Sequence, residues 1–213
     1  MPSLLRLDSS IDPVSSVSRR LTGVFADAWA TGGADHTVVA HDLVADPVPH
    51  LPHASLHWPP RLRPADAPSL PEADAVQQAV LAELRAADVL VVGAPMYNYS
   101  IPSFLKTWLD HVHVPGLMAP FDSDTQPMKG RPAVIVSSRG AIYDVDTATA
   151  TWDHTVPPLE LILGTALGME LHIVTVSRTL STSVPSMAGE QGRYEEELAA
   201  AEAQLRELAG ALR

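Results

Sequence analysis

A serine-rich segment near the N-terminus contains the residue types that bind anions. Five serines stand between positions 9 and 18, after a short apolar run and before a helical pattern. Free amides at a helix N-terminus favour an anionic group, and the hydroxyls of Ser10, Ser16 and Ser18 add donors. Serine is also among the best helix N-caps, so phosphate binding and plain capping both remain open. Neither GxGxxG nor GxxxxGKS/T is present, which excludes those two nucleotide-binding fingerprints.

A second candidate segment reads Pro-Met-Tyr-Asn-Tyr-Ser-Ile-Pro-Ser over residues 95–103. The amide of Asn98 offers a donor and an acceptor, and Tyr97 and Tyr99 present flat apolar rings with one polar end each. Pro102 stands near the first turn of a predicted helix, where proline is favoured. A third loop follows another apolar run and reads Ser138-Arg139-Gly140-Ala141-Ile142-Tyr143.

Composition limits the chemistry further. The chain has 14 basic and 25 acidic residues, and 14 − 25 = −11, which argues against non-specific binding to nucleic acid or anionic lipid. The absence of cysteine excludes a disulfide scaffold, a thiolate nucleophile, cysteine-ligated zinc and a cysteine-held iron–sulfur cluster. Any redox chemistry therefore needs a bound cofactor. With no signal peptide and no apolar run near the ~20 residues of a membrane span, we expect a cytoplasmic protein.

Apolar runs alternate with helical patterns along the chain. Continuous apolar runs are typical of parallel strands covered on both faces, and they span residues 3–7, 37–42, 89–94, 133–137 and 171–176. Helical patterns span residues 17–29, 75–87, 103–112, 158–167 and 193–212. This alternation predicts an α/β protein with a doubly wound five-stranded parallel sheet and helices on both faces.

The predicted sheet brings the three loops together. In an open parallel sheet, ligands bind beyond the carboxyl ends of the strands, and the loops after Leu7, Ala94 and Ser137 leave such ends. One segment breaks the alternation, because residues 47–71 hold eight prolines and three histidines. It cannot be a central strand or an uninterrupted helix. We predict one domain, residues 1–213, with a proline-rich insertion at about residues 43–73.

The second loop and the helix after it carry a family resemblance. Their pattern P-M-Y-N-x-x-I-P-x-x-L-K-x-W-x-D resembles the FMN-dependent NADH azoreductases, within the flavodoxin-like NAD(P)H:quinone oxidoreductases. The serine loop and the Ser-Arg-Gly turn align with the same family, and the resemblance covers nearly the whole chain. It implies a flavodoxin-like sheet of order 2-1-3-4-5, FMN as cofactor, NADH or NADPH as donor, and a homodimer.

The resemblance also implies a role for each loop. Ser10, Ser16, Val17 and Ser18 match the positions that hold the FMN phosphate. The segment along the flavin ring corresponds to Pro95, Met96, Tyr97, Asn98 and Tyr99. The loop near the pyrimidine end of the ring corresponds to Ser138, Arg139, Gly140 and Ala141.

Three residues depart from the family pattern. Asp8 places a carboxylate beside the phosphate loop, where it would lower affinity unless it points away or Arg19 or Arg20 compensates. Ala141 replaces a glycine, which matters if that position needs a positive φ. The segment from Ser177 lacks the usual Glu-Gly pair. These departures either weaken FMN binding or specialise the substrate pocket.

Other residues admit competing interpretations. His50, His53 and His57 invite a zinc hypothesis, but a proline-rich loop does not give fixed ligand geometry, so we expect solvated histidines and no metal site. Alternatively, His57 and Trp58 reach the flavin pocket of a partner subunit. Tyr143 either donates a proton to the substrate or packs over the flavin edge.

The preferred hypothesis is an FMN-dependent enzyme that moves two electrons from NAD(P)H to quinones or aromatic azo compounds by ping-pong hydride transfer. Its partner is then a small-molecule acceptor, with no nucleic acid and no membrane. A flavodoxin-type electron carrier is an alternative, because acidic carriers dock on basic partners. A reductase dedicated to one biosynthetic quinone or aromatic intermediate is another.

Overall fold

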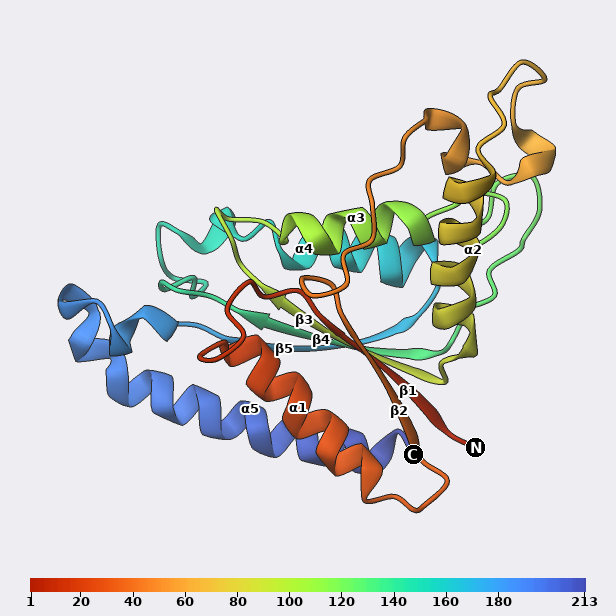
Figure 1. Ribbon diagram of the computed structural model, residues 1–213. Helices are drawn as coiled ribbons and strands as arrows, with labels where there is room; N and C mark the ends of the chain where they lie inside the picture. Colours follow the sequence, from red (N-terminus) through yellow and green to blue (C-terminus); the bar gives the residue numbers. More distant parts are fainter.

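The continuous apolar runs form the central sheet. The computed structural model describes all 213 residues, and its five strands are parallel and run in the order β2-β1-β3-β4-β5 (Figure 1). The strands are β1 (Ser3–Asp8), β2 (Thr37–Asp42), β3 (Val89–Pro95), β4 (Pro132–Ser138) and β5 (Glu170–Val176). The predicted order is therefore confirmed, and every predicted strand is present to within one residue at each end.

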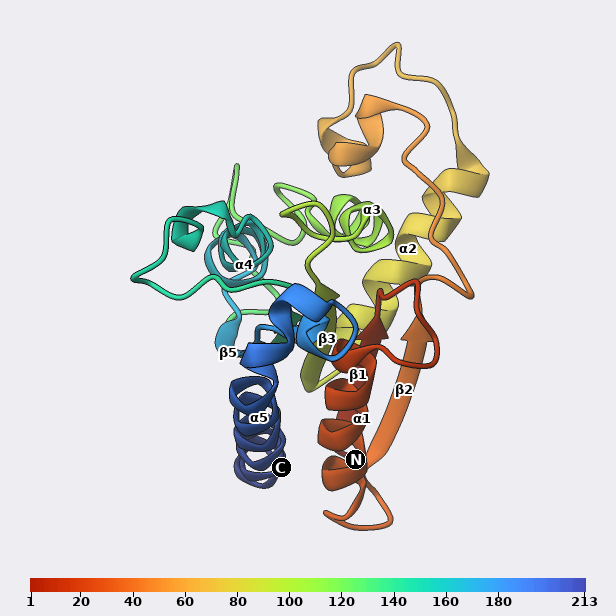
Figure 2. The same ribbon diagram turned by 90° about the vertical axis from the view of Figure 1, so that its left-hand side faces the viewer.

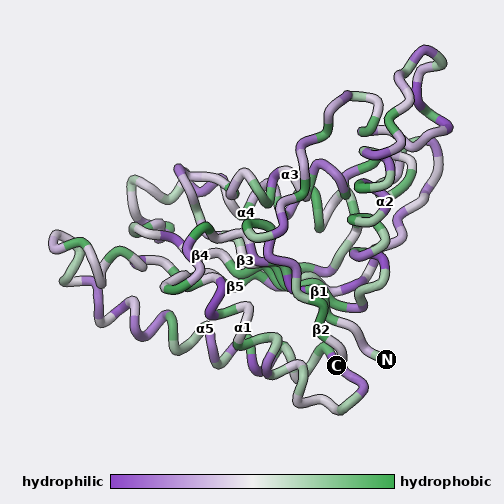
Figure 3. Tube along the Cα trace, viewed as in Figure 1, coloured by the Kyte–Doolittle hydropathy of each residue, from purple (hydrophilic) through white to green (hydrophobic).

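Helices cover both faces of this sheet. They are α1 (Val17–Ala30), α2 (Pro71–Ala86), α3 (Ser103–Val112), α4 (Val156–Leu159) and α5 (Gln191–Ala211). Figure 2 shows α1 and α5 on one face and α2, α3 and α4 on the other. Side chains of β1 alternate between the two cores, with Leu4 beneath α1 and α5, and Leu5 and Leu7 beneath α2 and α3. The apolar strands lie between more polar helices (Figure 3).

The structure corrects three details of the predicted elements. Helix α2 begins at Pro71, four residues before the predicted start, because proline is favoured in the first helical turn and Glu72 and Asp74 suit its dipole. The predicted helix over residues 158–167 is the short α4 followed by a π-helix, Glu160–Ala166. Strand β2 is at the sheet edge, and its side chains Val38 and Val39 are 37% and 50% exposed, so it is not covered on both faces.

The proline-rich segment leaves the body of the molecule and returns over α2 and α3 (Figure 1). It contains no strand, and two 3₁₀ turns, η1 (Ala54–His57) and η2 (Pro60–Leu62), form within it. Gln77 donates a hydrogen bond to the carbonyl of Leu56 at 2.9 Å, and His111 Nε2 lies 2.8 Å from the carbonyl oxygen of Pro49. These buried contacts hold the start of the segment on the two helices.

No helix in the structure is long and apolar enough to span a membrane.

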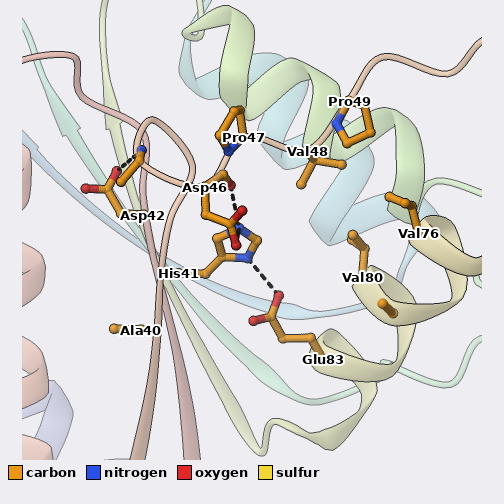
Figure 4. A pocket seen from close by; sticks show the side chains of 12 residues that line it. Ala40, His41, Asp42, Asp46, Pro47, Val48, Pro49, Val76, Val80 and Glu83 are labelled. Atoms are coloured by element: carbon orange, nitrogen blue, oxygen red, sulfur yellow. Dashed lines mark hydrogen bonds and ion pairs between the residues drawn. The ribbon is translucent and has the colours of Figure 1, made fainter.

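A groove of about 480 Å³ separates the end of β2 from α2, and His41 projects into it (Figure 4). Its Nδ1 lies 3.0 Å from the carboxylate of Glu83, and its Nε2 lies 2.9 Å from the carbonyl oxygen of Asp46. The hydrogen bond to Glu83 raises the pKa of His41 to about 9. The imidazolium therefore links the edge strand to α2 at neutral pH.

This link gives a pH-dependent stability. A histidine whose pKa is raised on folding contributes its full stabilisation below its unfolded pKa of 6.5 and loses it as the pH rises through about 9. We expect thermal unfolding curves of His41→Gln to approach those of the wild type between pH 6.5 and 9. The exposed His154→Gln serves as the control. A stability difference for His41→Gln that is constant over this range would contradict the prediction.

Candidate active site

A cavity of about 500 Å³ lies where the carboxyl ends of β1, β3 and β4 meet. All three predicted loops contribute to its wall, together with the segment after β5 and one residue of α5. The lining residues are Ser10, Asp12, Ser15, Ser16, Val17, Pro95, Met96, Tyr97, Ser138, Gly140, Thr179, Leu180, Thr182, Ser183 and Tyr194. The structure thus brings together residues that are more than 180 positions apart in the sequence.

The serine loop provides the donor-rich end of the cavity. Ser16 is the N-cap of α1, and its hydroxyl accepts the amide of Arg19 at 3.3 Å and lies 3.1 Å from that of Ser18. In a helix the first amides have no carbonyl partner, which leaves those of Val17 and Ser18 free. Capping and anion binding, which the sequence left as alternatives, are therefore compatible here.

Arg19 holds the serine loop in place through hydrogen bonds to its backbone. Its guanidinium donates to the carbonyl of Ser10 through Nη2 at 2.6 Å and through Nε at 3.0 Å. It also pairs with Asp42 at 2.7 Å, and this partner lowers the pKa of the Asp42 carboxyl to about 2. Arg19 does not line the cavity, and its charge is paired with that of Asp42.

The second loop is a strained hairpin. Tyr97 and Ser100 exchange two backbone hydrogen bonds of 3.0 and 3.1 Å, and the residues between them, Asn98 and Tyr99, have φ values of 48° and 70°. Two positive φ values in succession define a type I′ turn, which asparagine tolerates and a bulky tyrosine does not favour. Such strain costs about 1–3 kcal/mol per residue and is concentrated at functional sites.

The Tyr97 side chain connects the first two loops. Its hydroxyl lies 2.9 Å from that of Ser10 and accepts the amide of Ile11 at 3.1 Å. Tyr97 also borders a second cavity of about 580 Å³, which contains Asn98 and the start of α3. The predicted ring-binding segment therefore divides, with Pro95, Met96 and Tyr97 in the first cavity and Asn98 in the second. Tyr99 lines neither cavity and packs edge-on against Trp152 at 5.7 Å.

The third loop is paired with the segment after β5. Arg139 donates its amide to the carbonyl of Val176 at 2.8 Å, and Leu180 donates to that of Gly140 at 3.1 Å. A Cβ on Gly140 would lie 2.9 Å from a methyl carbon of Leu180, so a larger residue at this position would require the Leu180 side chain to move. Ala141 does not have a positive φ, so alanine can adopt the backbone conformation at this position. Its carbonyl accepts the amide of Arg178 at 3.1 Å.

Arg139 and Tyr143 of the third loop do not line the cavity. Arg139 pairs with Asp153 at 2.8 Å, and its guanidinium carbon lies 5.8 Å from the ring centre of Tyr143. Burial raises the pKa of the Tyr143 hydroxyl, so it remains protonated near neutral pH. Ser18 is buried and lies behind Ser16. From the third loop, only Ser138 and Gly140 line the cavity.

The Asp8 side chain, which departs from the family pattern, does not face the cavity. Its side chain points with that of Arg6 toward α1, where it accepts the hydroxyl of Thr22 at 2.6 Å and pairs with Arg6 at 2.9 Å. Asp8 is buried and does not line the cavity, so it points away from the phosphate loop. The carboxylate that does face the cavity is Asp12.

Several lining residues were not predicted from the sequence. Asp12 and Ser15 lie in the predicted serine loop, where their polarity was a usable signal. Thr179, Leu180, Thr182 and Ser183 follow the last strand, and the hydroxyl-rich sequence Thr-Leu-Ser-Thr-Ser was their only signal. Tyr194 occupies an apolar position on the stripe of α5, which gave no indication of a cavity.

The histidines of the proline-rich segment do not converge. His50 faces Thr107 at 3.3 Å, and His53 accepts the amide of Ser55 at 3.1 Å. No group of three or more potential metal ligands is present in the structure. His57 is exposed on η1 and lies outside the cavity of its own chain, next to Trp58, whose ring packs on Phe121 at 4.8 Å.

The cavity combines features that suit a flat ligand with an anionic tail. Hydroxyls and free amides gather at the helix terminus, while Pro95 and Met96 provide an apolar wall near the glycine of the third loop. Its volume lies within the ~300–1,000 Å³ usual for cofactor pockets.

Comparisons with known proteins agree with this description. The chain matches the model of a family described as having a flavodoxin-like fold, over residues 2–207. It is 50% identical over 212 residues to an FMN-dependent NADH:quinone oxidoreductase of Kineococcus radiotolerans, covering 100% of both chains. A Streptomyces avermitilis protein of the same name is 37% identical over 190 residues, covering 88% of this chain and 86% of its own.

Solved structures show the same fold at lower identity. An azoreductase from Bacillus anthracis superposes with a TM-score of 0.80 at 20% identity, covering 98% of this chain and 99% of its own. An FMN-dependent NADH-azoreductase from the same species, solved with FMN, gives 0.78 at 21% identity and covers 99% of both chains. The chain therefore belongs to the flavodoxin-like family that includes the FMN-dependent NADH:quinone oxidoreductases.

Proposed function

We propose that this protein is an FMN-dependent oxidoreductase that moves two electrons from NADH to quinones or aromatic azo compounds. The observation that carries this proposal is one cavity in which Ser16, Tyr97 and Gly140 bring the three strand-end loops together. The names of two relatives support it, since both are FMN-dependent NADH:quinone oxidoreductases.

The residues present fit FMN. The free amides of Val17 and Ser18 and the hydroxyls of Ser10 and Ser16 would hold the phosphate at the positive end of the α1 dipole. The apolar side chain of Met96 would lie along the ring system, and the side-chain amide of Asn98 is the group that would pair with its pyrimidine edge. Ser138 and Gly140, which line the first cavity, would bound the ring from that side.

The chain's own residues position the reactants. When bound, FMN supplies the two-electron chemistry between NADH and the acceptor. The strained hairpin fixes the backbone at Asn98, and the hydroxyl of Tyr97 holds the serine loop against the hairpin. We propose that donor and acceptor occupy the same side of the cavity in turn, which gives ping-pong kinetics. Tyr143 and, from a partner subunit, His57 are the proposed acceptor-pocket residues.

We also propose that the protein is a cytoplasmic homodimer. Phe121 is 62% exposed and forms an aromatic pair with Trp58, an arrangement that suits contact with a second copy near its flavin.

The absorbance spectrum with anaerobic NADH titration tests this function. We expect purified protein to be yellow, to release FMN rather than FAD on denaturation, and to be bleached by stoichiometric NADH. Steady-state assays with a simple quinone should give parallel double-reciprocal plots. Colourless protein that fails to bind added FMN would contradict the proposal. Turnover only with a separate reductase would identify an electron carrier, and activity confined to one elaborate acceptor would identify a dedicated reductase.

A further inference from the structure

We propose that Asp12 weakens the hold of this protein on the flavin phosphate, so that the cofactor binds loosely and exchanges. This inference rests on the proposed function. Asp12 is the one charged side chain among the 15 residues that line the cavity. It therefore faces the same space as the phosphate, which carries up to two negative charges.

No cation in the cavity wall offsets this carboxylate. The charge of Arg19 reaches Asp12 and helps to lower the pKa of its carboxyl, but Arg19 does not line the cavity. Each of the arginines near the loops already has a carboxylate partner. Arg19 pairs with Asp42, Arg20 with Glu202, Arg139 with Asp153, and Arg178 with three carboxylates. The phosphate must therefore be held by neutral donors alone, against the field of Asp12 and a chain of net charge −11.

Asp12 also occupies donors of the same loop. Its Oδ1 accepts the amides of Val14 and Ser15, each at 2.9 Å, and its Oδ2 accepts the hydroxyl of Ser15. The donors that remain for a phosphate are the hydroxyls of Ser10 and Ser16 and the first amides of α1. The carboxylate thus competes with the cofactor both by charge and by hydrogen bonding.

The charge of Asp12 persists at neutral pH. Hydrogen bonds from the hydroxyl and the amide of Ser15, together with that from Val14, lower the pKa of its carboxyl below the usual range. A phosphate monoester, in contrast, loses its second proton near pH 6. The repulsion between Asp12 and the phosphate therefore grows between pH 5 and pH 8, because the phosphate loses a proton over this range while Asp12 stays charged.

The test is Asp12→Asn, compared with the wild type by flavin fluorescence quenching on the cofactor-free protein. Asparagine keeps an oxygen that accepts the amides of Val14 and Ser15, so it removes the charge and preserves the turn. Riboflavin, which lacks the phosphate, is the second ligand. Asp27→Asn is the matched control, because Asp27 is exposed on α1, ten residues or about 15 Å beyond Val17.

We expect Asp12→Asn to bind FMN about tenfold more tightly at pH 8. The gain should shrink at pH 5, and riboflavin affinity should stay within about twofold by the same relation. Asp27→Asn should change neither affinity. FMN affinity that is unchanged or lower in Asp12→Asn, or an equal gain for riboflavin, would overturn the inference alone. Wild-type protein that binds neither flavin would overturn the proposed function as well.

Discussion

Replacement of Arg178 by methionine is expected to lower the free energy of unfolding by about 3–5 kcal/mol. The guanidinium is fully buried and pairs with Asp144, Glu190 and Glu197, with Nε 2.8 Å from Glu190. These carboxylates come from the loop after β4, the end of the turn η6 (Pro185–Glu190) and α5. Their presence raises the pKa of Arg178 above its usual range. Methionine would leave three carboxylates close together without their shared cation.

Urea denaturation monitored by far-UV circular dichroism measures this loss. Arg193→Met is the matched control, because Arg193 pairs with two of the same carboxylates but is 61% exposed. Exposed ion pairs contribute about 0–1 kcal/mol, so the control should remain near wild-type stability. Equal losses for the two variants would show that the burial of Arg178 has no special role.

The second large effect is expected from Tyr97→Phe. This change removes one oxygen that joins the serine loop to the hairpin through Ser10 and Ile11. These bonds hold the serine loop in place before FMN binds, so without them FMN binding must also order the loop. Each hydrogen bond contributes about 0.5–1.5 kcal/mol, so losing both should weaken FMN binding roughly tenfold. The free energy of unfolding should fall by a similar amount, since the bonds exist without the ligand.

Flavin titration and thermal unfolding of Tyr97→Phe provide both readouts. Tyr99→Phe is the control, because Tyr99 belongs to the same hairpin, lines neither cavity and keeps its ring against Trp152 in this variant. Its affinity should stay within about twofold of the wild type. If Tyr97→Phe binds FMN as the wild type does, the link between the loops does not support the cofactor site.

The fold was predictable because its signals are local and strong. Runs such as residues 89–94 and 133–137 are apolar throughout, as buried parallel strands require, and the helical stripes between them are regular. The strand order came from the resemblance, since periodicity does not reveal neighbours. The π-helix over residues 160–166 was not predicted, because apolar periodicity does not separate it from an α-helix.

The candidate site was predictable as a set of loops and not as a set of side chains. The sequence placed all three loops at one edge, yet Arg139 turns to Asp153 and Asp8 turns to Thr22, because local partners decide those directions. The sequence also did not predict that Asp12 lines the cavity. The wall from Thr179 to Ser183 depends on the docking of α5 through Arg178, a contact that no local pattern encodes.

The span of the cavity has a consequence for how the protein matures. Its wall begins at Ser10 and ends at Tyr194, so almost the entire chain must be in place before the pocket exists. The polypeptide must therefore fold first without help from its cofactor, and its own cores must supply enough stability for that step. A ligand that binds only the finished structure then adds about 1.4 kcal/mol for every tenfold excess over its Kd. Cells short of riboflavin would accordingly accumulate a folded but less protected form, whose proteolysis increases as the flavin supply falls.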